Sequence, residues 1–235
     1  GKFAHPIYRD KQRINDQGYL TNRLTQEAVA FIERNKARPF FLYLAYNAVH
    51  APAEAPQPDI AEFKQRYPQI SEERAILMAM LRHLDDGVGE VVGKLKKEGL
   101  FENTLLFFLT DNGGSKAMSA DNSPLRGFKG SVYEGGIRVP AIVRWPDHSA
   151  PGSKTDTPSY FPDWFPTLCE IAGTTPPKDL DGESLVSVIQ TAVPSNPSFA
   201  RGKPMIWEFH GYGGQLAVID GKWKAVRQKV RSKNP

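Results

Sequence analysis

The 235 residues contain one cysteine, Cys169, and no long apolar run. A single cysteine excludes an internal disulfide framework and a zinc cluster built from cysteines. The absence of a long apolar run excludes a membrane-spanning helix. The opening GKFAHPIYRDKQRIND has no apolar signal core, and the P-loop pattern GxxxxGK[ST] is absent. Because the first residue is Gly1 rather than Met, we expect a removed start or a piece of a longer protein.

The excess of positive charge is confined to the end of the chain. The net charge is +4, but residues 200–235 carry +6 and residues 1–199 carry −2. Nucleic-acid-binding proteins usually interleave basic and aromatic residues along one face, and residues 1–199 show no such stripe. We therefore expect no nucleic-acid partner. With 40% hydrophobic and 11% aromatic residues, the chain is predicted to fold as one large domain, or one plus a small one.

Hydrophobic periodicity predicts two amphipathic helices. In the first helix, apolar residues recur at helical spacing after two candidate caps, Thr21 and Thr25, and Arg38-Pro39 ends it. The second covers residues 71–98, has acidic residues in its first turn and lysines in its last, and stops at Gly99. Its predicted buried stripe consists of Leu77, Leu81, Leu84, Val88, Val91 and Leu95.

Short apolar runs predict the strands. Residues 40–46 and 105–109 read as strands buried in a sheet, and residues 141–145 as a third strand. Three prolines make residues 47–58 a predicted loop, and residues 160–173 form a helix interrupted by prolines. This order predicts an α/β fold, a mainly parallel sheet flanked by helices.

The last part of the chain is predicted to differ from the rest. Residues 176–204 are rich in proline and predict a surface passage. Residues 205–209, 215–219 and 223–227 predict antiparallel strands, the last two joined by a hairpin turn at Asp220-Gly221. We expect a partial α/β core over residues 1–199 and the start of a small, basic antiparallel subdomain over residues 200–235.

Polar residues at the ends of two predicted strands are candidates for chemistry, because ligands of α/β sheets collect beyond the carboxyl ends of strands. His50 follows the first strand, although it could equally be a histidine hydrogen-bonded under a proline-rich loop. Asp111 and Asn112 follow the second strand and offer hard oxygen donors for Ca²⁺ or Mg²⁺. The alternative for Asp111-Asn112-Gly113 is a simple turn.

A third candidate is the glycine-rich block at residues 124–140. Glycines let the backbone approach a ligand closely, and Lys129 stands between Gly127 and Gly130 as an ammonium suited to a tetrahedral oxyanion. The alternative is a glycine-rich connector whose Lys and Arg side chains are merely solvated.

Taken together, these blocks resemble the sulfatase family of the alkaline-phosphatase-like superfamily. The match runs through GYLTNRLTQEAVAFIERNKARPFFLYLAYNAVHAP (18–52), LDDGVGEVVGKLKKEGLFENTLLFFLTDNGG (84–114) and NSPLRGFKGSVYEGGIRVPAIVRWP (122–146). A weaker tail comprises residues 159–173 and 207–228. The resemblance implies a hydrolase of sulfate esters, with a sulfated small molecule or sulfated glycan as its partner and a periplasmic or secreted location.

The resemblance also implies roles for the candidate residues. Asp111 and Asn112 would be two ligands of a Ca²⁺ (or Mg²⁺) ion at the sulfate. Lys129 would hold sulfate oxygens and stabilise growing charge, and His50 would contact the sulfate and help protonate the leaving alcohol or phenol. Arg126, Glu134 and Arg138 are expected to brace the loop, and His210 could line the rim of the pocket.

Several family features are missing from these residues. The C/S-x-P-S/A-R sequence that yields the formylglycine nucleophile is absent, as are the paired aspartates near the family's N-terminus and a Lys-x-His segment. Cys169 is expected to be a small buried apolar residue. We therefore expect the middle and C-terminal part of a sulfatase, inactive alone because covalent catalysis requires the nucleophile.

Two alternatives remain. A hydrolase of phosphate or phosphonate esters from the same superfamily could share the metal-binding residues. A non-catalytic remnant or binding module could keep the fold and an anion pocket at His50 and Lys129. The identity of the sulfate ester and the oligomeric state do not follow from the sequence.

Overall fold

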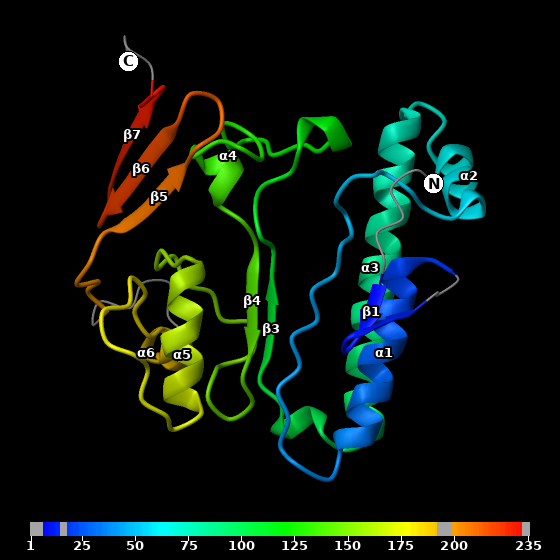
Figure 1. Cartoon of the computed structure of the whole chain (residues 1–235), viewed down its shortest axis with the longest axis horizontal. Coiled ribbons are helices and arrows are strands. Elements are labelled where there is room, and N and C mark those ends of the chain that lie inside the picture. The colour runs from blue at the N-terminus through cyan, green and yellow to red at the C-terminus, as the bar shows by residue number, and fades with distance from the viewer. Residues whose placement is uncertain (1–6, 15–17, 192–198, 232–235) are drawn as a thin grey trace. The chain divides into compact units, whose positions relative to one another are not determined.

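The computed structural model describes residues 7–14, 18–191 and 199–231. The chain forms two compact units, residues 1–102 and 103–235, and Figure 1 labels the elements of each. The domain boundary predicted between residues 199 and 200 stays a prediction. Among the helices in the described ranges, none combines the length and the hydropathy needed to cross a bilayer.

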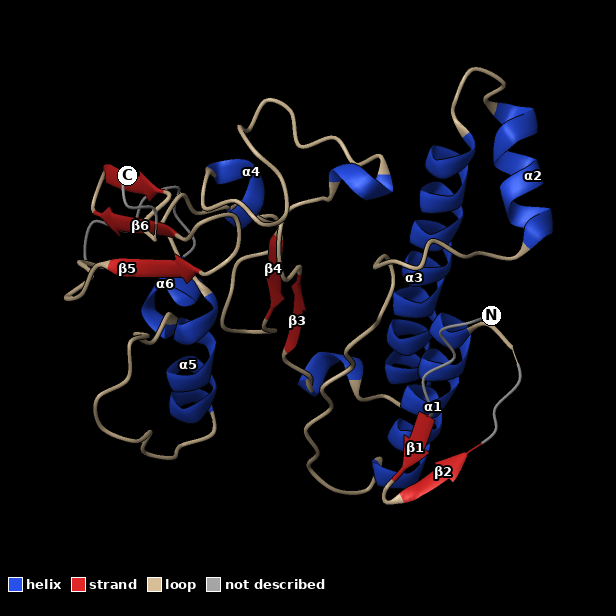
Figure 2. Cartoon of the chain, turned by 45° about the horizontal axis from the view of Figure 1, so that its top comes forward, coloured by secondary structure: helices blue, strands red, loops and turns tan. Residues whose placement is uncertain are grey.

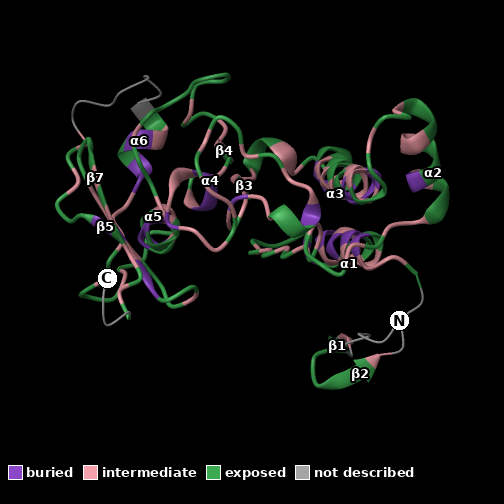
Figure 3. Cartoon of the chain, turned by 90° about the horizontal axis from the view of Figure 1, so that it is seen from above, coloured by how far each residue is buried: buried purple, intermediate pink, exposed green. Residues whose placement is uncertain are grey.

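Two long helices build the first unit. The helices α1 (Leu20–Asn35) and α3 (Glu72–Lys97) lie side by side (Figure 1). Both were predicted, and Ser71 caps α3 by accepting a hydrogen bond from the Arg74 amide at 3.2 Å. Burial is concentrated along parts of both helices (Figure 3), and the buried apolar residues of the pair are Ala28, Ile32, Ala75, Leu77, Ala79, Met80, Val91 and Leu95.

Two details of the helix prediction were wrong. Thr21 and Thr25 do not cap α1; both are buried within it, and Thr25 Oγ1 donates to the Thr21 carbonyl at 3.0 Å. Leu81 is 46% exposed, so the buried stripe of α3 passes through Met80 instead. The stop of α3 at Gly99 is confirmed by its positive φ of 71°.

A network of lysines and glutamates joins the C-terminal ends of α1 and α3. Lys36 Nζ lies 2.7 Å from Glu33 and 2.8 Å from Glu98, and Lys94 pairs with the same two glutamates. Hydrogen bonds from Lys36 and Lys94 lower the pKa of Glu33 to about 2 and lower the pKa of Glu98. The network therefore ties the two helices together most firmly when both carboxylates are ionised.

The helix α2 (Gln57–Arg66) was not predicted. Its Ile60 packs on α3 residues in a small apolar cluster. Asp59 accepts a hydrogen bond from His83 Nε2 at 2.9 Å and also pairs with Arg82, and these contacts lower the pKa of Asp59. Polar and apolar contacts thus hold α2 against α3 immediately after the loop that carries His50.

The predicted strand at residues 40–46 belongs to no sheet among the described residues. The segment is extended, and its exposure alternates from one residue to the next rather than being low throughout. Phe40 stacks edge-on against Phe31 of α1, and the Tyr46 hydroxyl lies 2.8 Å from Thr25 Oγ1. Phe41 and Tyr43 point the other way and are 72% and 80% exposed. The expectation of burial on both faces was wrong.

Two further strand pairs each form a two-stranded antiparallel sheet. The strands β1 (Ile7–Arg9) and β2 (Gln12–Ile14), which were not predicted, pair antiparallel in the first unit. In the second unit, β3 (Leu106–Leu109) pairs antiparallel with β4 (Ala141–Arg144), with Phe107 opposite Val143 (Figure 2). Both strands were predicted, but β3 is only partly buried, and no parallel pair occurs among the described residues.

A buried carboxylate, that of Asp163, connects several segments of the second unit by hydrogen bonds. The predicted helix at residues 160–173 is present as η3 (Phe161–Asp163) followed by α5 (Trp164–Ile171). Asp163, fully buried, accepts hydrogen bonds from the Tyr160 and Glu183 amides, both at 2.9 Å, and from Arg201. Cys169 is buried, as expected.

The passage predicted for residues 176–204 is not only surface. It includes the helix α6 (Val186–Thr191), and Leu185, Val186 and Val188 are buried. Residues 192–198 of that passage lie outside the described residues. The short elements of this unit are η1 (Phe101–Asn103), which spans the boundary between the units, η2 (Lys116–Met118) and α4 (Glu134–Ile137).

The predicted C-terminal antiparallel sheet is confirmed. It consists of β5 (Met205–Phe209), β6 (Gln215–Asp220) and β7 (Trp223–Gln228), in that spatial order (Figure 2). Gln215 stands opposite Phe209 on one side and Gln228 on the other. Met205, Gln215 and Ala217 share one face and are buried, whereas Ile206 on the other face is 57% exposed.

Candidate functional site

The turn after β3 presents the two predicted metal ligands. Asp111 is exposed and Asn112 is half-buried. Asn112 Nδ2 donates to the Gly113 carbonyl at 3.0 Å, which leaves Oδ1 as the amide's ligand atom. Gly113 is buried so tightly that a Cβ there would lie 1.9 Å from the Gly135 carbonyl oxygen. The turn is therefore fixed by its packing against the glycine-rich block.

Lys129 lies on a loop that hydrogen-bonds to this turn. Its backbone amide donates to the Gly114 carbonyl at 3.1 Å, while its side chain is exposed. Gly127 and Gly130, on either side, have φ of 94° and 86°, a conformation that favours glycine. The structure thus brings the turn with Asp111 and Asn112 together with the Lys129 loop.

Asn122 fastens the two loops to each other, and sequence reasoning missed it. Its Oδ1 accepts from the Gly114 amide at 3.0 Å, and its Nδ2 donates to the Gly114 and Gly127 carbonyls at 3.0 and 3.2 Å. One side chain therefore satisfies three backbone groups on both sides of the site. The only signal in the sequence was its position at the head of the 122–146 block.

Two of the three residues predicted to brace the Lys129 loop, Arg126 and Glu134, make such side-chain contacts. The Arg126 guanidinium lies over the Tyr133 ring, 4.0 Å from its centre. Glu134 accepts a hydrogen bond from Lys224 Nζ of β7 at 2.5 Å. These contacts tie the block to its own tyrosine and to the C-terminal sheet.

The first unit presents His50 on the loop before α2. His50 is exposed, its amide donates to the Asn47 carbonyl at 2.8 Å, and its Nδ1 donates to the Ala51 carbonyl at 2.7 Å. A carbonyl oxygen can only accept, so Nδ1 carries the proton and Nε2 is the nitrogen that can exchange one with a ligand. The catalytic role of His50 stays a prediction.

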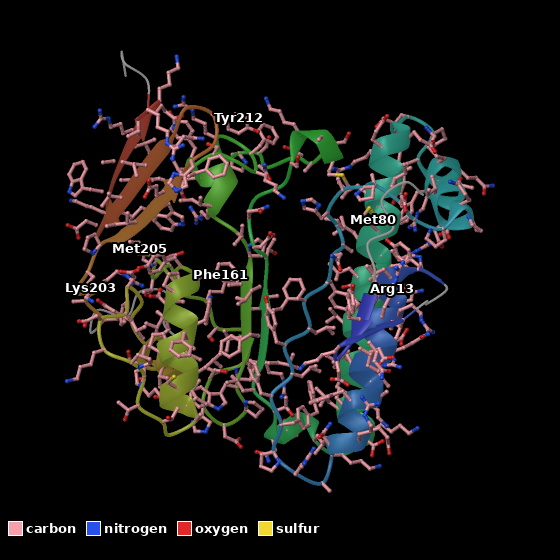
Figure 4. The ribbon with its side chains drawn as sticks, in the orientation of Figure 1. Arg13, Met80, Phe161, Lys203, Met205 and Tyr212 are labelled. Atoms are coloured by element: carbon pink, nitrogen blue, oxygen red, sulfur yellow. The ribbon has the colours of Figure 1, made fainter. Side chains whose placement is uncertain are left out.

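The C-terminal sheet meets the Lys129 loop at Gly130. Gln215 Nε2 donates to the Gly130 carbonyl at 2.8 Å. The Tyr212 ring lies close enough that a Cβ on Gly130 would be 2.9 Å from Tyr212 Cε2. Figure 4 shows Tyr212 on the loop between β5 and β6. Residues beyond 200 therefore help form the surroundings of Lys129.

The chemistry of the donors decides what metal they suit. The Asp111 carboxylate and the Asn112 amide oxygen are hard donors, which fit Ca²⁺ or Mg²⁺. Within the described ranges, no three His, Cys, Asp or Glu side chains gather as a metal site. Ca²⁺ takes six to eight oxygen ligands, so Asp111 and Asn112 fit part of such a shell.

Comparison with known proteins agrees with this reading. A family model described as Sulfatase matches residues 2–174, and one described as N-sulphoglucosamine sulphohydrolase, C-terminal, matches residues 128–229. The steryl-sulfatase of Mus musculus is 37% identical over 191 residues, 76% of this chain and 29% of that protein. The N-acetylgalactosamine-6-sulfatase of Mus musculus is 32% identical over 243 residues, 94% of this chain and 43% of that protein.

Solved structures show the same relationship. Ps i-CgsB in complex with k-i-k-neocarrahexaose is 35% identical, with a TM-score of 0.85, and the match covers 95% of this chain and 49% of that one. The phosphonate monoester hydrolase of Agrobacterium radiobacter, 20% identical with a TM-score of 0.67, matches 97% of this chain and 56% of that one and shows the shared fold alone. The chain thus spans between 29% and 56% of the length of these relatives.

These matches confirm the α/β, alkaline-phosphatase-like fold class with its small antiparallel C-terminal sheet. The first family model covers most of the chain, and it includes Asp111, Asn112 and Lys129. The chain therefore belongs to the sulfatase family, as the resemblance in its sequence predicted.

Proposed function

We propose that this chain is the part of a sulfuric ester hydrolase that binds the sulfate group and supplies some of the ligands of its divalent cation. The observation that carries the proposal is the hydrogen-bonded attachment of the Asp111-Asn112 turn to the Lys129 loop, through the Lys129 amide and Asn122. It places the Lys129 backbone beside the turn that carries two oxygen ligands, and an ammonium group near such ligands is suited to a tetrahedral oxyanion.

Each residue has a distinct task in this proposal. Asp111 and Asn112 hold Ca²⁺ or Mg²⁺, which when bound supplies charge stabilisation to a sulfate oxygen. The Lys129 ammonium hydrogen-bonds other sulfate oxygens and stabilises charge that grows as the S–O bond to the leaving group breaks. His50 would give a proton from Nε2 to the departing oxygen, so that the alcohol or phenol leaves neutral. This role requires a ring protonated on both nitrogens, because Nδ1 already donates to the Ala51 carbonyl.

The nucleophile belongs to residues outside this sequence. No C/S-x-P-S/A-R sequence occurs in the 235 residues, so we expect the chain alone to hydrolyse no aryl sulfate. Metal-dependent turnover by the pure chain would contradict this. A hydrolase of phosphate or phosphonate esters is the second candidate, and its support is a likeness of fold.

Sulfate binding tests the proposal without requiring turnover. Isothermal titration of the chain with sodium sulfate, in the presence of Ca²⁺, should give binding that Lys129→Ala weakens about 10- to 100-fold, as expected for one charged hydrogen bond. Lys154→Ala, which removes another exposed lysine of the same unit, is the matched control and should bind as the wild type does.

Competition separates the alternatives. If phosphate and methylphosphonate bind more tightly than sulfate, the phosphate and phosphonate ester hydrolase becomes the better assignment. If sulfate binding is equal in the wild type and in Lys129→Ala, Lys129 does not hold the anion and the proposal is wrong.

A further inference from the structure

A small pocket opens at the end of the C-terminal sheet, where the loop from β5 to β6 meets the residues after β7. Its volume is about 140 Å³. Two backbone hydrogen bonds shape it, from the Val230 amide to the Gly214 carbonyl at 3.1 Å and from the Arg231 amide to the Gly213 carbonyl at 2.8 Å. The lining combines an apolar and a polar set of side chains: Phe209, Leu216 and Val230, and Glu208, His210 and Arg231.

The polar set is arranged to hydrogen-bond rather than to hold a bare anion. Arg231 Nη2 donates to His210 Nδ1 at 2.8 Å. Because a guanidinium only donates, Nδ1 accepts this hydrogen bond and Nε2 is the ring nitrogen that carries a hydrogen. The Glu208 carboxylate, 3.5 Å from the same ring, offsets the charge of Arg231. The pocket therefore offers donors and acceptors with little net charge.

The pocket is connected directly to the proposed sulfate site. Gln215 lines it and also donates to the carbonyl of Gly130, the residue after Lys129. Tyr212, on the same loop as His210, packs its ring against Gly130 and is 79% exposed (Figure 4). The Tyr212 and Phe209 rings have their centres 6.0 Å apart. An open aromatic surface thus lies between the pocket and the Lys129 loop.

We propose that this pocket and the exposed face of Tyr212 bind a sugar ring of a sulfated oligosaccharide, next to the unit whose sulfate Lys129 holds. The inference rests on the proposed function, which it deepens by choosing a glycan over a small aryl sulfate. A pyranose ring has an apolar face that packs on an aromatic ring and hydroxyl groups that pair with planar polar side chains.

The size and charge of the pocket support one ring rather than a second sulfate. The volume is well below the roughly 300–1,000 Å³ of pockets that enclose a drug-sized ligand, so it accommodates one ring or the end of a chain. A second sulfate would lie beside the Glu208 carboxylate, which carries a like charge and repels it. A neutral hydroxylated ring meets neither obstacle.

The backbone of Tyr212 makes a clean test possible. Its φ of 52° lies in the left-handed region, which glycine adopts without strain. Tyr212→Gly therefore removes the ring without straining the loop, and His210→Ala independently removes one polar group. Trp223→Ala is the matched control, because Trp223 is a similarly exposed aromatic residue, 74%, at the start of β7.

The test compares two probes on the chain as it is, by isothermal titration. With the k-i-k-neocarrahexaose that was solved bound to Ps i-CgsB, Tyr212→Gly and His210→Ala should each bind about tenfold more weakly than the wild type. With sodium sulfate, both variants should bind as the wild type does. Trp223→Ala should leave both affinities unchanged.

The results separate this inference from the proposed function. The sugar site is overturned if the wild type does not bind the hexasaccharide, or if both pocket variants bind it as the wild type does. It is also overturned if Trp223→Ala weakens hexasaccharide binding as much as the pocket variants do. A failure of the proposed function appears elsewhere, as sulfate binding that survives Lys129→Ala. Weakened hexasaccharide binding in the pocket variants together with unchanged sulfate binding supports the sugar site.

Discussion

Replacement of Arg201 by alanine is expected to destabilise the second unit by about 3–5 kcal/mol, the usual cost of removing one partner of a buried ion pair. Asp163 has no exposed side-chain surface and Arg201 has 13%. The guanidinium donates to both carboxylate oxygens, at 3.0 and 2.6 Å. Among the described residues, the Tyr160 and Glu183 amides would be the remaining hydrogen-bond donors to the buried carboxylate.

One smaller contribution adds to this cost. Arg201 lies 5.3 Å from the centre of the Tyr160 ring, and such a contact contributes about 0.5–1 kcal/mol. Arg201→Lys keeps the charge but loses the paired geometry, so it should cost less than Arg201→Ala. Lys154→Ala, at an exposed position of the same unit, should change the free energy of unfolding by no more than about 0.5 kcal/mol.

Urea unfolding followed by tryptophan fluorescence measures these differences, provided that the dependence on urea is unchanged between variants. The expected order of stability is wild type, Arg201→Lys, Arg201→Ala. A loss below about 1 kcal/mol in Arg201→Ala would mean that water or rearrangement stabilises the Asp163 carboxylate, and the argument from burial would be refuted.

Three further predictions concern other parts of the chain. Glu98→Gln should lower the melting temperature at pH 7, and its difference in melting temperature from the wild type should narrow as the pH falls from 5 toward 2. The reason is that a lowered folded-state pKa gives stability that is lost on acidification. A difference in melting temperature that stays constant with pH contradicts this. Asn122→Asp keeps one acceptor but turns an oxygen toward two carbonyls, so urea unfolding should show that the free energy of unfolding falls by about 1–3 kcal/mol. An unchanged free energy would mean that Asn122 does not hold the two loops together. Gly135→Ala would put a Cβ 2.2 Å from the Gly127 carbonyl oxygen and should weaken sulfate binding at Lys129 in titration, whereas Gly93→Ala, which meets nothing within 4 Å, should not; equal binding by all three proteins contradicts it.

The helices were predictable where a long apolar stripe is bounded by residues with a clear local preference. The helix α3 has a capping serine before it and a glycine after it, and both act as expected. The helix α2 was missed because three prolines suggested a loop, yet Pro58 stands in the first turn, where proline needs no hydrogen-bond partner. Proline counts therefore mislead when the position in the turn is ignored.

Strand positions were predictable but their surroundings were not. The runs at residues 105–109 and 141–145 form β3 and β4, while their antiparallel pairing depends on the path of residues 110–140. Periodicity within one segment carries no information about which segment lies beside it. The same limit explains why the apolar run at residues 40–46 was predicted to be buried on both faces, whereas its exposure alternates in the structure.

At the candidate site, the residue types were predictable and their supports were not. Asp111, Asn112 and Lys129 stand out because carboxylate, amide and ammonium groups follow strand ends or glycines. Asn122 does not, because an asparagine in a loop most often serves a local turn. Its three hydrogen bonds join groups that lie up to eight residues away, and only the folded loops reveal them.

The extended segment at residues 40–46 has a practical consequence for work with this chain. Its seven residues, FFLYLAY, contain no charge and no proline, and Phe41 and Tyr43 are largely exposed. Uncharged segments of six or seven residues with high β-propensity are the sequences that stack into cross-β fibrils. Concentrated or agitated samples should therefore form thioflavin-positive aggregates through this segment, and a lysine at position 43 should extend the working life of the purified protein.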